Sequence, residues 1–171
     1  MTISMYSASV PLLKQILTNL DAMLTKAEIH VKERKIEPAA LLQARLFPDM
    51  MHFTRQVQMA SDNAKGIAGR LAGVDLPSFP DTEQSFEELH VRLAKTMAFL
   101  DTIKPEQVDG SEKRPIVVYQ GSPWEMKFDG HTYLVHYGLP NFLFHVTTAY
   151  ALLRHNGIDV GKADFIGHVP N

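Results

Sequence analysis

The sequence predicts an all-α protein, a four-helix bundle with a small β-hairpin insertion between its third and fourth helices. Three observations predict this fold. Apolar residues recur every three or four positions in four separate stretches, which is the spacing of one helix face. Turn signals and short β-branched runs are confined to residues 106–138. The length of 171 residues fits a single domain over residues 1–171.

The first long helix is expected from residue 5 or 9 to about residue 30. Its buried face is the stripe Leu13, Leu17, Leu20 and Leu24. If Ser9 is the N-cap, Pro11 falls in the first turn, where a proline fits a helix. A charged connector over residues 31–37 and a short helical turn from Pro38 should follow.

Prolines and a glycine mark the expected ends of the next two helices. Pro48 should open the second long helix, which is expected to run to about residue 71, with Gly73 just past its end as a C-cap. The third helix is expected from residue 82 or 84 to residue 103, where Pro105 blocks its continuation. Its apolar stripe is Phe86, Leu89, Leu93, Met97 and Leu100.

The sequence pattern changes from helical to strand-like in the insertion between the third and fourth helices. Residues 115–119 and 125–128 are predicted to be strands of a hairpin, and residues 131–135 are a third candidate strand. Pro140 then sets the entry to a fourth helix that ends near Gly157. The tail, residues 158–171, is expected to be a loop lying against the bundle.

The bulk composition excludes several classes of function. With 17 basic and 19 acidic residues the net charge is −2, so we expect no nucleic-acid partner. No stretch approaches the roughly 20 uninterrupted apolar residues that a membrane span needs, so we expect no membrane partner. The first ten residues lack the pattern of a secretory signal, which favours a cytoplasmic protein. The absence of cysteine excludes disulfides, thiolate metal sites and cysteine nucleophiles.

The fourth helix holds the most informative pair of polar residues. It is apolar nearly all round, which predicts that protein surrounds it. Asn141 and His145 are four residues apart and therefore share a face. An unpaired polar group buried there would cost about 1–3 kcal/mol, so each side chain must find a partner.

The second helix offers a matching polar stripe, made of Asp49, His52, Gln56 and Asn63. If this stripe faces the fourth helix, His52 and His145 could meet in the core with Asn141 beside them. Two imidazoles, an oxygen ligand and a water would suit a divalent ion, zinc or nickel. Asp49 is then the best candidate for a general base. The alternative is a buried polar cluster in which the histidine is simply hydrogen-bonded.

Several runs resemble a bacterial family of domains of unknown function that is grouped with the DinB/YfiT-like metalloenzymes. The run that carries the resemblance best is LPNFLFHVTTAYALLRHNG over residues 139–157, followed by GKADF over residues 161–165. Residues 48–50, 55–57 and 70–73 are similar to the second-helix pattern of the family. The resemblance covers most of the chain.

The resemblance implies a four-helix bundle, often a homodimer, that holds a divalent metal. One metal-binding histidine lies on the second helix and a His-x-x-x-His pair lies on the fourth. His145 matches the second histidine of that pair, whereas Asn141 stands at the first, and His52 lies on the right helix. The implied function is a metal-dependent transferase or hydrolase with a core site between the second and fourth helices. The alternative is a metal-free bundle that binds a small molecule or dimerises, without catalytic activity.

Overall fold

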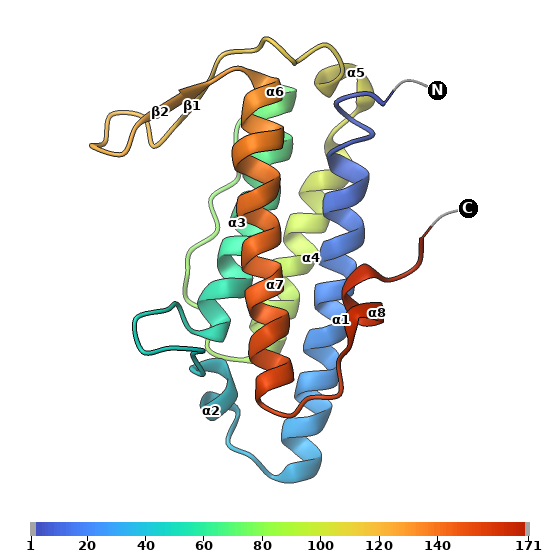
Figure 1. Ribbon diagram of the computed structural model, residues 1–171, viewed down its shortest axis with the longest axis vertical. Coiled ribbons are helices and arrows are strands. Elements are labelled where there is room, and N and C mark those ends of the chain that lie inside the picture. The colour runs from blue at the N-terminus through green and yellow to red at the C-terminus, as the bar shows by residue number, and fades with distance from the viewer. Residues whose placement is uncertain (1–2, 170–171) are drawn as a thin grey trace.

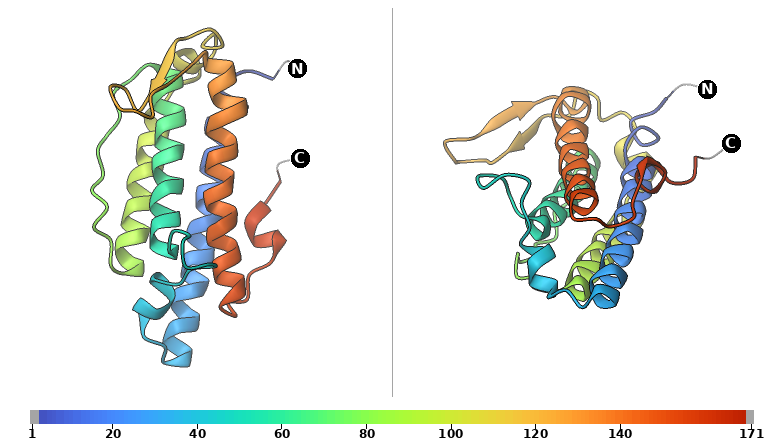
Figure 2. Two further views of the ribbon diagram at one scale, coloured as in Figure 1. Left: turned by 60° about the vertical axis from the view of Figure 1, so that its left-hand side comes forward. Right: turned by 60° about the horizontal axis from the view of Figure 1, so that its bottom comes forward.

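The computed structural model describes residues 3–169 and confirms the bundle (Figure 1). Four long helices form it: α1 (Val10–Arg34), α3 (Phe53–Ala72), α4 (Phe86–Thr102) and α7 (Leu139–His155). The connection between α4 and α7 carries a two-stranded antiparallel hairpin, which projects from one end of the bundle (Figures 1 and 2). The predicted fold class and the place of the insertion are therefore both correct.

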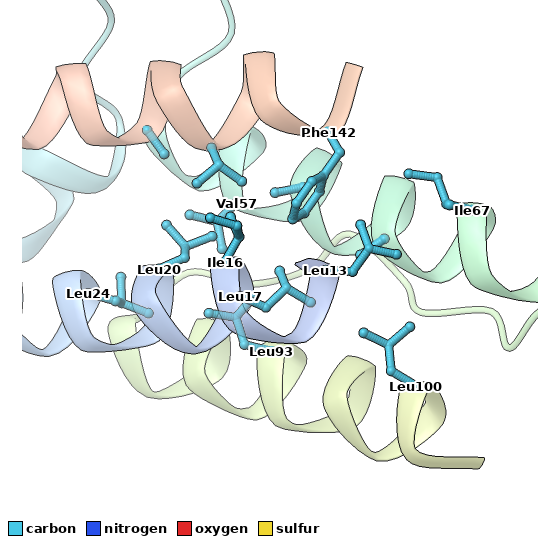
Figure 3. Packing of buried hydrophobic residues seen from close by; sticks show 14 of the residues in the cluster. Leu13, Ile16, Leu17, Leu20, Leu24, Val57, Ile67, Leu93, Leu100 and Phe142 are labelled. Atoms are coloured by element: carbon cyan, nitrogen blue, oxygen red, sulfur yellow. The ribbon is translucent and has the colours of Figure 1, made fainter. Parts of the chain in front are cut away.

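The predicted leucine stripe of α1 is the centre of the core. All four leucines of that stripe are fully buried (Figure 3). They meet Val57 and Ile67 from α3, Leu93 from α4, and Phe142 from α7. Each long helix thus contributes one apolar face to a single cluster, as ridge-and-groove packing of a bundle requires.

The helix α1 is longer than predicted at its C-terminal end. It starts after Ser9, with Pro11 in its first turn as expected, and runs on to Arg34. Lys35 ends the helix in the left-handed conformation, with φ 55°. Val31 extends the buried stripe by one more turn, so the segment expected to be a solvated connector is mostly helix. A short helix, α2 (Pro38–Leu42), follows as predicted.

The start of α3 differs from the prediction. Residues 43–52 form a loop, and the helix begins at Phe53 rather than at Pro48. The loop is closed by the Phe53 N–H, which donates to the Ala44 carbonyl at 3.0 Å, and by a bond from Arg45 to the Met50 carbonyl. These bonds hold the backbone out of the helical path until residue 52. Asp49 consequently lies in the loop, exposed, and not on the helix face where it was expected.

The third long helix starts with a capping box. The Ser85 hydroxyl accepts from the Glu88 N–H at 3.1 Å, and the Glu88 carboxylate accepts from the Ser85 N–H at 3.1 Å. The short helix α5 (Pro105–Val108) follows α4. The strands β1 (Ile116–Val118) and β2 (Met126–Phe128) then pair in antiparallel register, with Val117 opposite Lys127. Both predicted strands of the hairpin are confirmed.

The third candidate strand is wrong. Residues 131–135 fall in a helical turn, α6 (Gly130–Thr132), and in a π-helical segment, η1 (Tyr133–Gly138), that runs directly into α7. Asp129 starts this helix, since its carboxylate accepts from the Thr132 N–H at 2.7 Å. Pro140 has no N–H and therefore cannot donate the hydrogen bond that an α-helix would make to the preceding turn. The wider π-helical segment ends two residues before this proline.

The tail also differs from the predicted loop. It contains a short helix, α8 (Lys162–Ile166), packed against α1. Asn19 on α1 donates to the Phe165 carbonyl at 2.9 Å, and Lys26 pairs with Asp164 at 2.7 Å. Among residues 3–169, no helix has the length and apolarity to cross a membrane.

An ion cluster around the buried Arg92 side chain holds the extended segment 75–85 against α3 and α4. The Arg92 side chain is 1% exposed and pairs with Asp62 at 2.9 Å, Asp81 at 3.0 Å and Glu83 at 3.0 Å. Gln58 on α3 donates to the second oxygen of Glu83 at 2.8 Å. A buried guanidinium is tolerated because carboxylates surround it. We call Arg92, Asp62, Asp81 and Glu83 the Arg92 cluster.

Candidate functional site

The most unusual polar contact of the core joins α3 to α7, the helix pair with the most extensive contact. His145 is only 6% exposed, and its Nδ1 lies 2.8 Å from Oε1 of Gln56. Gln56 is itself 2% exposed. The predicted polar face of the second helix therefore does meet the histidine of the fourth helix, and the residue that meets it is Gln56.

The hydrogen bonds around Gln56 fix which atom of the imidazole carries the proton. The Gln56 amide nitrogen donates to the Met51 carbonyl at 3.1 Å, so its oxygen is the atom turned toward His145. An amide oxygen can only accept, so Nδ1 of His145 must be the donor. Its Nε2 makes no hydrogen bond within residues 3–169, and it is not sealed from solvent.

Burial and charge both keep this imidazole neutral. Burial lowers the pKa of His145 below its ordinary value, and the nearby positive charge of Arg55 lowers it further. A neutral imidazole that is protonated on Nδ1 presents a lone pair on Nε2. His145 can thus accept a hydrogen bond or a proton, or bind a metal ion, at neutral pH.

The structure gives His52 a different role in the fold. It is the N-cap of α3, and its Nδ1 accepts from the Arg55 N–H at 3.3 Å. Burial lowers the pKa of His52, and the charges of Arg45 and Arg55 act in the same direction. Asn141 lies one turn before His145 on α7, half-buried. Its amide makes no hydrogen bond to another side chain or carbonyl in the part of the chain that the structure describes.

The donors around His145 fit a divalent ion poorly as they stand. Structural and catalytic zinc sites use at least three strong ligands from His, Cys, Asp or Glu. Within residues 3–169, no three such side chains gather where they could hold an ion. The amide of Gln56 on α3 contacts His145, the amide of Asn141 shares its face of α7, and Nδ1 of His52 is engaged in capping. The predicted ligand set His52, Asn141 and His145 stays a prediction.

A cavity of about 290 Å³ lies beside this site, between α3, the end of β1 and η1. Arg55 lines it and also acts on His145, so the cavity and the imidazole share one charged neighbour. The hairpin and the 43–52 loop project from the same side of the bundle (Figure 1; right-hand view of Figure 2).

The sequence reasoning missed the tyrosines of this cavity. Tyr119, Tyr133 and Tyr137 all line it. Tyr133 and Tyr137 are four residues apart, the spacing of one helix face, but residues 131–135 were assigned to a strand, where that relation is lost. The tyrosine rings of residues 133 and 137 stack with centroids 6.0 Å apart.

Comparisons with known proteins agree with the fold. Residues 5–166 match the family model described as "Domain of unknown function (DUF1993)". The chain is similar to the crystal structure of a DinB family member protein from Shewanella denitrificans, with 34% identity and a TM-score of 0.90. That match covers 97% of this chain and 93% of the other. No curated protein matches the chain.

Proposed function

The chain belongs to the DUF1993 family and has a DinB-like fold, and on this premise we propose that it binds a small organic molecule between α3 and α7. His145 is the group that contacts the ligand. The observation that carries the proposal is the buried hydrogen bond from Nδ1 of His145 to Gln56, at 2.8 Å. It orients the ring and leaves its other nitrogen as an acceptor that makes no hydrogen bond to any residue from 3 to 169.

The size and position of the neighbouring cavity support this function. Small-molecule sites are concave and provided with a few convergent polar groups. This cavity lies between α3, the end of β1 and η1, and its lining is largely polar. The cavity of about 290 Å³ is at the small end of that class. Arg55, which lines the cavity, lies near enough to His145 to lower the pKa of its imidazole.

The chemistry of a neutral imidazole defines what the ligand must offer. Nε2 of His145 accepts a hydrogen bond, so the ligand should carry an O–H or N–H donor. If the ligand is a substrate, the same atom can take that proton as a general base. The lowered pKa of His145 keeps Nε2 unprotonated at neutral pH, which both roles need.

A metal-dependent transferase or hydrolase is the second candidate. One observation favours it: metal-binding histidines usually donate their other ring N–H to an oxygen, as His145 does to Gln56. His52 and Asn141 would complete the ligand set, and the ion would lower the pKa of a bound water or thiol. The homodimer that the resemblance implies is a separate prediction.

A fragment titration followed by NMR tests the first candidate. Small alcohols, phenols and amides are titrated into the 15N-labelled protein and into two variants. His145→Leu removes Nε2, and His155→Leu removes an exposed imidazole from the same helix as a control. Donor-bearing fragments should shift the signals of Gln56 and residues 141–145, lose at least about tenfold in affinity in His145→Leu, and bind His155→Leu unchanged.

The opposite outcomes are equally plain. If no fragment shifts the α3–α7 signals, or if His145→Leu binds as well as the wild type, the proposal fails. Metal content per chain is measured in parallel, after incubation of the tag-free protein with zinc or nickel. One ion per chain that is lost in His145→Leu would establish the metal candidate instead.

A further inference from the structure

The tyrosine-lined cavity beside His145 holds a positive charge that the fold does not neutralise. Arg55 and Arg70 both line this cavity, together with the carboxylate of Asp62. Arg55 pairs with Asp81, and Asp62 pairs with Arg92 at 2.9 Å and with Lys65 at 3.0 Å. No carboxylate in residues 3–169 lies within 4.0 Å of Arg70.

The guanidinium of Arg70 is positioned rather than free in solvent. Its Nη1 donates to the Tyr133 hydroxyl at 3.1 Å, and its side chain is half-buried. One turn earlier on α3, Gly66 leaves room for it, since a Cβ at residue 66 would lie 2.4 Å from that same Nη1. A glycine inside a helix is less stable than an alanine. At residue 66 the glycine is nevertheless needed, because it leaves the space that the Arg70 side chain occupies.

The tyrosines complete a wall suited to a flat ligand. The rings of Tyr133 and Tyr137 stack at 6.0 Å, and Phe128 from β2 packs 5.2 Å from Tyr137. Burial raises the pKa of Tyr133, and burial with the neighbouring Tyr119 raises the pKa of Tyr137. The phenols of Tyr133, which is buried, and Tyr137, which is partly buried, are thus protonated donors at neutral pH. Tyr119 has φ 53°, in the left-handed region that an aromatic residue rarely adopts. Residues held in such conformations occur often at functional sites.

We propose that this cavity binds a small organic carboxylate, held by Arg70 and by the tyrosine hydroxyls. This site is separate from the one proposed at His145, because the lining of the cavity does not include His145 and Arg70 lies about 21 Å along α3 from Gln56. Arg70 is the cationic group of the lining that lacks an anionic partner, so the charge of a monoanion matches it. A guanidinium recognises a carboxylate through paired hydrogen bonds, and its phenol neighbours supply further donors. The stacked rings favour an aromatic or planar acid.

Benzoate is the probe, with benzamide as its neutral counterpart and inorganic phosphate as the competing anion. Each is titrated into 15N-labelled protein, and the amide shifts of Gly66, Arg70 and Tyr137 report both location and affinity. Benzoate should saturate these signals, and benzamide should bind at least about tenfold more weakly. Arg70→Met should weaken benzoate by about tenfold or more, whereas Arg154→Met, an exposed arginine on α7, should leave it unchanged.

A second variant removes the doubt that a lost arginine damages the fold. Gly66→Ala keeps every charge and displaces only the flexible end of Arg70. Alanine favours a helix interior over glycine, so the melting temperature should rise or stay the same. Benzoate affinity should nevertheless fall by about tenfold, as in Arg70→Met.

Three results overturn the assignment. The first is that benzoate binds Arg70→Met as tightly as it binds the wild type. The second is that benzoate shifts none of these amide signals. The third is that phosphate saturates these signals at a lower concentration than benzoate. The two proposals fail in different ways. If neutral fragments bind at His145 while benzoate does not bind at Arg70, only the carboxylate site is wrong; if benzoate binds at Arg70 while nothing binds at His145, only the proposed function is wrong.

Discussion

Gln56 and His145 face one another across the contact between α3 and α7, with Oε1 and Nδ1 2.8 Å apart. The residues are 89 positions apart in the sequence, and both are buried. The contact anchors the imidazole at one nitrogen and leaves the other available. Several consequences of this arrangement, and of the core around it, can be measured.

Replacing Gln56 with leucine should destabilise the protein. Leucine has nearly the same volume but leaves Nδ1–H of His145 and the Met51 carbonyl without their partners. The free energy of unfolding in urea should fall by about 1–3 kcal/mol, the cost of buried polar groups left unpaired. The matched control is Gln120→Leu in the exposed hairpin, which should change stability by less than about 0.5 kcal/mol. Equal effects of the two substitutions would show that the buried contact contributes no stability.

Stability should depend on pH through His145. Its pKa is lowered by folding, so the unfolded chain takes up a proton more readily than the folded protein. The stabilisation is therefore fully present above the unfolded pKa of about 6.5 and is lost as pH falls through the folded value. Between the two pKa values the slope from this one group approaches about 1.4 kcal/mol per pH unit.

The slope is measured by urea unfolding between pH 8 and pH 5, in wild type and in His145→Leu. His52 and the carboxylates contribute to both proteins, so the difference between them isolates His145. The variant should show the smaller loss of stability on acidification. Parallel curves would mean that folding leaves the pKa of His145 unchanged.

The Arg92 cluster should be the most sensitive polar feature of the fold. Arg92→Met removes a cation that is 1% exposed and leaves Glu83, whose side chain is 10% exposed, without its charged partner. Breaking a buried ion pair from one side costs about 3–5 kcal/mol, so we expect a loss of that size in chemical denaturation. Arg154→Met, at an exposed position, should stay within about 0.5 kcal/mol of wild type. A loss below about 1 kcal/mol in Arg92→Met would contradict the structural role of the cluster.

Two phenylalanines on α7 make a matched test of its orientation. Phe142 is fully buried against α1 and α3, whereas Phe144 is 56% exposed (Figure 3 for Phe142). Phe142→Ala should cost about 3–5 kcal/mol of unfolding free energy through the cavity that it creates. Phe144→Ala should cost much less, because most of its ring is already in contact with water. Thermal unfolding of both variants checks the difference, and a reversed order would place α7 in a different rotation.

Sequence patterns recovered the bundle because each long helix buries one continuous apolar stripe. The leucines of α1 and the prolines and glycines at helix ends are local signals that are readable without the fold. The boundaries that failed depend on tertiary contacts. Pro48 is typical of a helix start, but the bonds of Ala44 and Arg45 keep that segment in a loop. The β-branched and aromatic residues at 132–135 suggested a strand, although residues 133–135 form the first half of a π-helical segment.

The site was predicted in part, for the same reason. The polar stripe of the second helix contained both His52 and Gln56, and only the observed helix start shows that His52 is its cap. The Arg92 cluster was not predicted, since Asp62 lies 30 residues before Arg92 on another helix, and Glu83 lies in the extended segment before α4. One local signal did exist, because Arg92 lies on the apolar face of the helix, between Leu89 and Leu93. An arginine is buried at such a position only when it is paired, so carboxylate partners could have been expected.

The proton on the His145 ring is the most direct test of the proposed site. Long-range 1H–15N NMR correlations distinguish the protonated from the unprotonated ring nitrogen. Because Gln56 accepts from Nδ1, the imidazole should be neutral at pH 7.5, with its proton on Nδ1 and a free lone pair on Nε2. A proton on Nε2, or on both nitrogens, at that pH would contradict it, because His145 could then neither accept a ligand proton nor bind a metal ion through Nε2.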